Sequence, residues 1–539
     1  MKKGFLGLIL KIYFLANFVN GTDMSNVDFI KKLYNGKNCY SDHMDKEQLE
    51  LLHIHSSVED IIVNLIRKRK IVFLTGNPGD GKTFIIRAIE ESIKNESIYI
   101  ETDVNKVESY ETIVSSIVEC FEKKKGAIIA VNEYPFYKLQ REIRKASPSL
   151  FEQILLAKNT CITYDISDGR TGDVIIIDLN ERNLLDDKTN IPEQILDKMC
   201  LLISQDDFID KDVEYNVKAL SDPFVKNQFL ALVKLSMYRY EHYAIRDILG
   251  AFAFILTACL SDEYKGLRYY DAMFEGDNPL LNAIKQFDPI YLTKLSLDEE
   301  LWNGTSFNDV GWKFGYPSKW PNSQAYVDDP DAALRCFISL KRRFYFENEN
   351  GASLLQLQPK EISECINFFV NCKKDQRTLK QKIIRALNKL FQPSSDDKKT
   401  LYIWTTHRYD MSKDALVSIS KKSIGYEDLE LLLPQPSDWL KNMEYIPNHL
   451  LLRSSSNHNV SLMLDVDFLR TLDAVDNGYP PALLSPEYEQ KVARFLQQLD
   501  DNGLTEENDS GEVMIASRTR GDMFSVYIRD NKYSFEEDE

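Results

Sequence analysis

The sequence predicts an α/β protein whose first domain is a parallel sheet covered by helices. Three short apolar runs, 71–74, 127–131 and 173–179, have the length and composition of buried parallel strands. Stretches with helical spacing of apolar residues alternate with them, as right-handed strand–helix–strand connections require. A glycine-rich turn joins the first of these strands directly to the next helix. Strand, loop and helix therefore follow one another at the start of the domain.

Composition and periodicity divide the chain into four segments. Residues 1–56 are an N-terminal lead-in that is polar from residue 24, and 57–190 form the sheet domain. Mainly amphipathic helices follow over 191–397, which we interpret as a lid and accessory region. The polar stretch 393–399 then leads into a β-rich C-terminal domain over 398–539.

The elements of the sheet domain follow in order from their patterns. A helix over 57–69 has apolar residues at helical spacing, and Ser56 or Ser57 can cap it. Further segments are expected as follows: strand 71–74, helix 84–93, strand 97–100, helix 109–124, strand 127–131, helix 139–156, and strands 161–166 and 173–179. In the C-terminal domain we expect strands 401–404, 416–419 and 450–453, a helix over 486–499 and a hairpin over 512–528.

The composition excludes several classes of protein. In 539 residues, 43% are apolar and 28% charged, as in soluble globular proteins, so a disordered or polytopic membrane protein is not expected. The formal charge of −17 repels a polyanion, so any nucleic-acid contact must be local. The eight cysteines form no Cys-x-x-Cys pair and no Cys/His zinc spacing, which indicates reduced, mostly buried thiols.

The N-terminal segment 1–23 resembles a secretory signal, because three residues including two lysines precede an apolar run. Lys11 interrupts that run, and Met24 opens an ordinary polar segment. We therefore expect an over-extended start in preference to a membrane anchor or a signal peptide, and a cytoplasmic protein. The apolar run 248–260 is too short to span a bilayer and is typical of a buried helix.

The glycine-rich turn carries the most specific chemical signal. It reads Gly76, Asn77, Pro78, Gly79, Asp80, Gly81, Lys82, Thr83 and then Phe84, which matches the Walker A pattern G-x-x-x-x-G-K-[ST]. Glycines let the backbone amides point at phosphates, and the following helix N-terminus adds positive potential. Lys82 is expected to pair with the β and γ phosphates, and Thr83 to ligate Mg²⁺. The pattern thus predicts ATP and Mg²⁺ as cofactors of a P-loop NTPase of the AAA type; the alternative is a chance glycine-rich turn.

Hydrolysis also needs a carboxylate at the end of a neighbouring strand. Glu133 follows the apolar run 127–131 and is our preferred base. Asn132 stands where an aspartate is usual and is a weaker partner for the metal's water shell, which predicts slow hydrolysis. Asp178, at the end of the later strand, is the rival, although it can equally cap the next turn. Asn180 is then the candidate γ-phosphate sensor.

Other cationic residues are candidates for phosphate contacts. Arg246 begins an apolar helix in the expected lid, where it can reach the nucleotide or form a surface salt bridge with Asp247 or Glu241. Arg182 is a weaker candidate for a finger donated to a neighbouring subunit. The basic helix 373–389 can contact DNA or be a solvated face, and the second interpretation is preferred.

The histidines carry no evident chemistry in the sequence. His53, His55 and His407 show no triad or metal spacing, so packing or surface roles are expected for them.

Several of these features together resemble a restriction-associated ATPase family. The segment Leu52-His53-Ile54-His55, the Gly-Asp-Gly-Lys-Thr loop, Val131-Asn132-Glu133 and Arg246 are similar to those of DptF-like ATPases of DNA phosphorothioation-dependent restriction systems. This resemblance implies a motor or switch subunit of a bacterial anti-phage defence complex, which acts with partner proteins and lacks a nuclease site of its own. Partner subunits, DNA contact through them or through 373–389, and homo-oligomerisation are expectations on the same basis.

Two alternatives stay open. A STAND-type signalling or scaffold protein uses the same loop as an assembly switch with little turnover. Asn132, in place of the usual aspartate, is compatible with that interpretation. A kinase also uses such a loop, but the lid arginine and the long helical extension fit it poorly.

Overall fold

The computed structural model describes residues 25–34, 50–94, 97–104, 109–158, 160–164, 172–184, 189–237, 242–304, 311–315, 317–357, 374–408, 416–508, 511–529 and 532–536. The apolar segment 1–23 therefore lies outside the described residues. The chain forms two compact units. The first comprises Met1–Cys161, Thr171–Leu357 and Asn442–Tyr445, and the second comprises Ile162–Arg170, Gln358–Lys441 and Ile446–Glu539.

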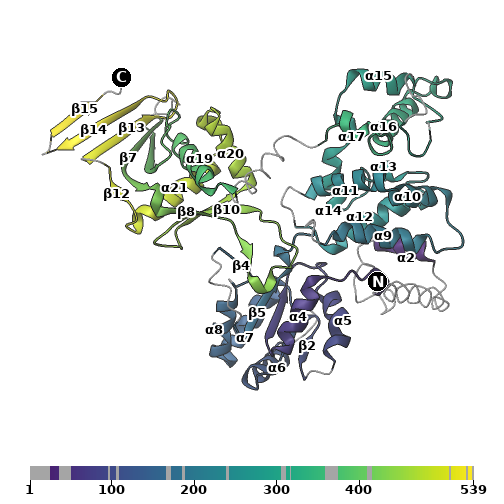
Figure 1. The fold of residues 1–539 in the computed structure, drawn as a ribbon, viewed down its shortest axis with the longest axis horizontal. Coiled ribbons are helices and arrows are strands. Elements are labelled where there is room, and N and C mark those ends of the chain that lie inside the picture. Colours follow the sequence, from purple (N-terminus) through teal and green to yellow (C-terminus); the bar gives the residue numbers. More distant parts are fainter. Residues whose placement is uncertain are drawn as a thin grey trace. The chain divides into compact units, whose positions relative to one another are not determined.

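The first unit contains a four-stranded parallel sheet, which confirms an α/β fold (Figure 1). Its strands lie in the order β2 (Tyr99–Glu101), β3 (Ala127–Ala130), β1 (Ile71–Thr75) and β5 (Val174–Asp178). Every residue of β1 and β3 is buried, which explains their continuous apolar runs. Since all strands are parallel, the carboxyl ends of β3 and β5 lie on either side of the carboxyl end of β1.

Helices cover both faces of this sheet. They are α4 (Ser57–Arg67), α5 (Lys82–Ile93), α6 (Glu111–Glu122), α7 (Glu133–Ala146) and α8 (Pro148–Ala157). Alternate strand residues such as Phe73, Ile129 and Ile176 share one hydrophobic core with α6, α7 and α8. The helix α4 packs against β1, and α5 packs against β3 and α4. The predicted Ser56 cap is confirmed, since its hydroxyl accepts from the amide of Val58 in a capping box with Glu59.

The rest of the first unit is helical. It comprises α2 (Asn26–Leu33), α9 (Ile191–Ile203), α10 (Lys211–Ser221), α11 (Pro223–Met237), α12 (Ile245–Thr257), α13 (Tyr269–Ala272), α14 (Pro279–Ile284), α15 (Leu295–Asn303), α16 (Pro330–Glu347) and α17 (Gly351–Leu354). The apolar helix α12 is buried along most of its length and packs against α2, α9 and α10. Within the described part of the chain, no helix combines the length and apolar character needed to cross a bilayer.

In its described residues, the second unit is built from antiparallel sheets and three helices. A six-stranded sheet contains β6 (Thr400–Arg408), β7 (Leu416–Gly425), β12 (Glu506–Glu507), β13 (Glu512–Ser517), β14 (Met523–Arg529) and β15 (Lys532–Glu536). A three-stranded sheet contains β8 (Leu429–Leu432), β10 (His449–Ser454) and β11 (Ser461–Asp465), and β4 (Ile162–Thr163) pairs with β9 (Gln435–Pro436). The helices are α19 (Gln376–Lys389), α20 (Val466–Asp476) and α21 (Pro486–Asp501). The predicted hairpin is confirmed, because β13 pairs with β14.

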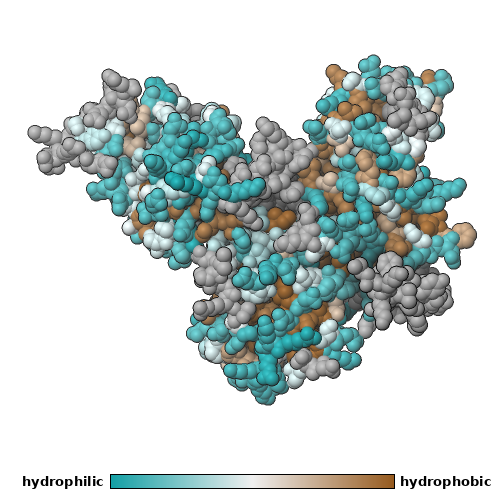
Figure 2. Space-filling model, viewed as in Figure 1, coloured by the Kyte–Doolittle hydropathy of each residue, from teal (hydrophilic) through white to brown (hydrophobic). Residues whose placement is uncertain are grey.

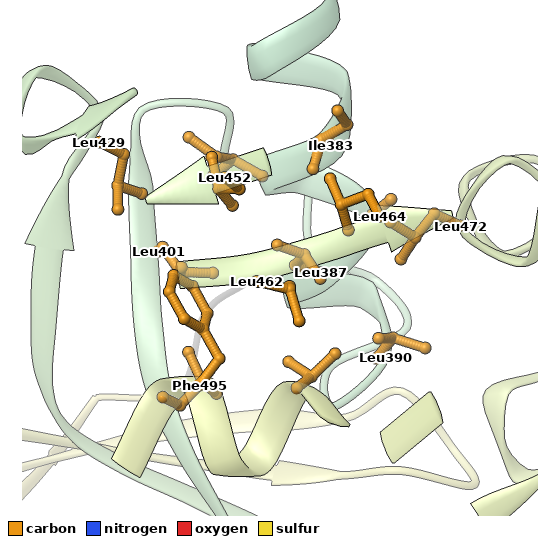
Figure 3. Packing of buried hydrophobic residues seen from close by; sticks show 14 of the residues in the cluster. Ile383, Leu387, Leu390, Leu401, Leu429, Leu452, Leu462, Leu464, Leu472 and Phe495 are labelled. Atoms are coloured by element: carbon orange, nitrogen blue, oxygen red, sulfur yellow. The ribbon is translucent and has the colours of Figure 1, made fainter. Parts of the chain in front are cut away.

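The core of the second unit places α19 in this unit. Ile383 and Leu387 of α19, and Leu390 at its C-terminal cap, pack with Leu462 of β11 and Phe495 of α21 (Figure 3). The division between the units therefore falls before α19, whereas the sequence suggested a boundary after this helix, at 397/398.

The basic face of α19 is largely engaged within the second unit. Lys382 pairs with Asp473, and Arg385 makes two bonds of 2.7 Å to the carboxylate of Asp476. Lys380 Nζ donates to the carbonyl oxygens of Tyr426 and Leu429. These contacts favour a structural role for the helix over phosphate binding; Lys373 lies outside the described residues.

Hydrophilic residues cover most of the face drawn in Figure 2, with apolar residues in patches, as expected for a highly charged chain.

Candidate functional site

The loop between β1 and α5 has a conformation that requires glycine. Gly76 has φ of 141°, and a Cβ added there would lie 2.6 Å from Asp80 Oδ2. Gly79 has φ of 102°, and a Cβ there would lie 3.1 Å from the guanidinium carbon of Arg246. Any other residue at these positions would have to displace a neighbouring side chain and take up a left-handed or otherwise strained backbone. Gly76 and Gly79 are therefore required for two reasons: neighbouring side chains lie close to their Cα atoms, and their backbone angles are ones that other residues rarely adopt.

The helix that follows the loop begins without a side-chain cap. Gly81, in the left-handed conformation, is its N-cap residue, and no side chain accepts a hydrogen bond from its first amides. The neighbouring helix α4 has a complete capping box at the same position. Uncapped amides and the helix dipole attract an anion. The start of α5 is therefore an electropositive position at the carboxyl end of β1.

Lys82 is folded back onto the loop. Its Nζ donates to the carbonyl oxygens of Gly76 at 2.8 Å and Asn77 at 2.7 Å. Burial lowers the pKa of Lys82, and the carboxylates of Asp80, Asp103 and Asp178 oppose this effect. Its side chain is 8% exposed. A buried ammonium held only by carbonyls and nearby acids is a favourable contact for a phosphate oxygen.

Thr83 and Phe84, the last residues of the predicted loop motif, each contact a neighbouring segment. The Thr83 hydroxyl is half-buried and donates to the carbonyl oxygen of Thr102, which follows β2, at 3.2 Å. The ring of Phe84 lies 5.5 Å from the ring of His53.

The predicted polar residues at the strand ends are brought together beside the loop. Asp178 ends β5 opposite Thr75 of β1, and its Oδ1 accepts from the amide of Asn180 at 3.1 Å. The Asn180 side chain donates to Glu133 Oε1 at 3.1 Å and accepts from the amide of Asn77 at 3.2 Å. Asn180 therefore connects Glu133 to the loop between β1 and α5.

The two candidate carboxylates occupy different surroundings. Asp178 caps the turn after β5, as the structural alternative anticipated, yet its charge also acts on Lys82. Glu133 is exposed at the first position of α7, and Asn132 is its N-cap residue without a side-chain cap bond. The geometry gives Asp178 the position beside Lys82 and leaves Glu133 facing solvent, held by Asn180.

Arg246 lies against the loop between β1 and α5. Its Nη2 donates to the carbonyl oxygen of Pro78 at 3.2 Å, and its backbone amide donates to the carbonyl oxygen of Gly79 at 3.3 Å. Asp247 serves as a backbone cap, since its Oδ2 accepts from the amide of Ala244. The helix α12 thus touches the loop through its first turn.

A contact between His242 and Asp80 was not foreseen from the sequence. His242 Nε2 lies 2.7 Å from Asp80 Oδ1, while Asp80 Oδ2 accepts from the amide of Asn77 at 2.5 Å. The bond to Asp80 raises the pKa of His242, against the opposing effect of burial. A contact across 162 residues leaves no local pattern, so only the structure could reveal it.

This pair predicts a pH-dependent contribution to stability. Because the pKa of folded His242 is raised above 6.5, its ion pair stabilises the fold fully below that value and is lost as pH rises through the folded pKa. Asp80, Asp178 and Asp247 supply the facing negative charge. We expect His242→Gln to lower stability by about 1 kcal/mol in mildly acidic solution and by less in alkaline solution.

Thermal unfolding of both proteins at several pH values measures the difference. His458→Gln, a change at an exposed histidine of the second unit, is the matched control and should show no such trend. An equal gap between wild type and His242→Gln at every pH would contradict the ion pair.

The expectation for Arg182 is wrong, and two histidines have a partner that was not foreseen. Arg182 cannot serve as a finger for another subunit, because it is buried and its Nε bonds to Glu444 Oε2 at 2.6 Å. His53 and His55 share a partner that the sequence analysis did not foresee, since both rings lie within hydrogen-bond distance of the Glu59 carboxylate. The sequence carried this signal as H-x-H-x-x-x-E, a spacing that leads from an extended segment into the first turn of a helix. The ring of His407 lies outside what the structure describes.

Comparisons of the chain with protein-family models, with curated proteins and with solved structures found no match.

Proposed function

We propose that the chain is an ATP-binding and ATP-hydrolysing motor or switch subunit built on a P-loop NTPase domain of the AAA type. One observation carries this proposal. The uncapped N-terminus of α5, the glycine turn and the buried Lys82 ammonium converge at the carboxyl end of β1. That combination of amides, helix dipole and lysine suits a triphosphate.

Lys82 and Thr83 of the loop, with two residues beside it, then have roles in binding. Lys82 exchanges the carbonyl oxygens of Gly76 and Asn77 for oxygens of the β and γ phosphates. The residues present fit Mg²⁺, because the Thr83 hydroxyl and the Asp178 carboxylate are the hard oxygen donors that this ion prefers. When bound, Mg²⁺ would neutralise phosphate charge. The guanidinium of Arg246 lies at the rim of the loop, where it can pair with negative charge on the γ phosphate.

Glu133 and Asn180 act on the attacking water in this proposal. Asn180 fixes the Glu133 carboxylate through a bond of 3.1 Å and contacts the loop through its side-chain oxygen. A carboxylate held in this way accepts a proton from water as a general base. Because Asn132 replaces the more usual aspartate, we expect turnover to be slow. The same feature favours the second candidate, a STAND-type switch in which nucleotide binding drives assembly and little ATP is hydrolysed.

The cellular role that we propose follows from the resemblance to DptF-like ATPases. The chain would be the ATPase subunit of a bacterial DNA restriction and anti-phage system and would act with partner subunits. The engaged cations of α19 support DNA contact through such partners in preference to direct binding by this helix. If the chain forms a homo-oligomer, its arginine finger must be a residue other than the buried Arg182.

Removal of Arg246 tests the lid part of the proposal. We expect Arg246→Ala to lower the steady-state rate of phosphate release by about tenfold or more, because transition-state charge loses a guanidinium partner. ATP affinity should change far less than the rate. Phosphate release and equilibrium binding of labelled ATP, measured on the same preparation, separate the two effects.

Arg87→Ala, at another arginine of the first unit on α5, is the matched control. If Arg246→Ala keeps the wild-type rate, Arg246 has no role in turnover. If wild type releases no phosphate but binds ATP, the switch function is favoured.

A further inference from the structure

The segment before α4 brings three metal-binding side chains to one point. His53 Nε2 lies 3.0 Å from Glu59 Oε1, and His55 Nδ1 lies 3.1 Å from Glu59 Oε2. One ligand atom from each residue can be chosen so that all three lie within 4.8 Å of one another. The backbone is extended at Ser56 and becomes helical at Ser57, so the two histidines reach back over the first turn of the helix.

The Glu59 carboxylate is held in position by the fold. Its side chain is 6% exposed, and Oε1 accepts from the amide of Ser56 at 3.3 Å as part of the capping box. The carboxylate therefore cannot turn away into solvent without breaking the helix cap. A buried, oriented carboxylate between two imidazoles is a preorganised donor set.

Residues outside the three-residue cluster also fix the positions of the two histidines. His55 Nε2, the ring nitrogen that faces away from Glu59, lies 3.0 Å from Asp60 Oδ2. A carboxylate on the outer nitrogen of a histidine fixes its tautomer and raises its basicity as a ligand. His53 is fixed through its carbonyl oxygen, which accepts from Lys198, and through its ring contact with Phe84.

We propose that His53, His55 and Glu59 form a binding site for a first-row divalent transition metal such as Zn²⁺. Two imidazoles and one carboxylate leave an open fourth position, a donor set that Zn²⁺ accepts. Bonds of 2.0–2.1 Å in a tetrahedron place donor atoms about 3.3 Å apart, close to the 3.1 Å that separates Glu59 Oε2 from both His53 Nε2 and His55 Nδ1. An ion entering the site would displace the protons of these hydrogen bonds.

The metal would connect two parts of the first unit. His53 and His55 precede α4, and the His53 ring touches Phe84 at the start of α5. The ion would therefore hold the extended segment onto α4 beside the helix that begins at the phosphate loop. This inference depends only on the three side chains, and it stands or fails independently of ATP binding.

Isothermal titration of ZnCl₂ into the full chain tests the site. The protein should carry no histidine tag, be stripped with chelator and then be freed of it, and be titrated with excess Mg²⁺ present to occupy oxygen-only sites. We expect one Zn²⁺ per chain at this site, and weaker binding by at least tenfold in His55→Ala and in Glu59→Gln. His55 is the safer position, because its side chain is 61% exposed and its removal should not disturb folding.

His458→Ala is the matched control, since it removes an exposed histidine of the second unit and should bind Zn²⁺ as wild type does. Visible absorption of the Co²⁺-loaded protein adds a second readout, because a tetrahedral site with nitrogen ligands gives bands that Co²⁺ in water lacks. Loss of these bands in His55→Ala supports the site. Equal Zn²⁺ affinity of wild type and His55→Ala, or no binding by wild type, would overturn it and leave a hydrogen-bonded cluster only.

Discussion

Replacing Lys82 with alanine is expected to reduce ATP affinity by about 100-fold or more. Its Nζ is the only Lys or Arg side-chain nitrogen among residues 76–83 of the loop, and it lies 2.8 and 2.7 Å from the carbonyl oxygens that phosphate would replace. Two charge-assisted hydrogen bonds of about 1.5–3 kcal/mol each account for a loss of this size. Anisotropy of a fluorescent ATP analogue in the presence of Mg²⁺ measures it.

Lys94→Ala provides the matched control for this change. Lys94 follows the other end of the same helix, is 73% exposed and lies 3.9 Å from Glu91. We expect its removal to leave ATP affinity unchanged. If Lys82→Ala binds ATP as tightly as wild type while remaining folded, the loop is not the phosphate site.

Replacing Glu133 with glutamine should abolish most turnover while leaving ATP bound. Glutamine preserves the shape of the side chain and can still accept the 3.1 Å hydrogen bond from Asn180, but it cannot accept a proton. Loss of a general base lowers a rate by about 10²–10⁴-fold. Steady-state phosphate release gives the rate, and labelled ATP gives the affinity.

Asp178→Asn separates the two carboxylates. Asp178 stabilises the charge of Lys82, so its loss should weaken binding of Mg²⁺-ATP as well as slow the reaction. Glu142→Gln, on the exposed side of α7 and paired with Lys145, should behave as wild type. If Glu133→Gln turns over normally and Asp178→Asn is inactive with unchanged affinity, the roles assigned to Glu133 and Asp178 must be exchanged.

The features that the sequence predicted well are local ones. The strand–loop–helix unit around Lys82 depends on neighbouring residues, so its apolar run and glycines were sufficient to find it. The Ser56 cap and the hairpin of β13 and β14 were found for the same reason. Arg246 lies in the first turn of an apolar helix, as expected, and its bond to the Pro78 carbonyl joins residues 168 positions apart, which no local pattern shows.

Most of the features that were missed join distant parts of the chain. Arg182 looked available, but its partner Glu444 lies 262 residues away and buries it. The cations of 373–389 were expected to form a solvated face in preference to a DNA contact, but Asp473 and Asp476 of α20 pair with two of them. The histidine cluster was within reach of sequence reasoning, because both histidines and Glu59 lie in one short segment. Its recognition required the geometry of the capping box, which turns Glu59 back towards them.

The central claim is that residues 76–83 hold the triphosphate of ATP. The most direct measurement is an experimental structure of the chain with Mg²⁺ and a non-hydrolysable ATP analogue. Our account predicts that Lys82 Nζ leaves the carbonyl oxygens of Gly76 and Asn77 and lies within hydrogen-bond distance of the β and γ phosphates, with the amides at the start of α5 directed at the same oxygens. A triphosphate bound elsewhere, or none at saturating analogue with Lys82 still bonded to the loop, would contradict it.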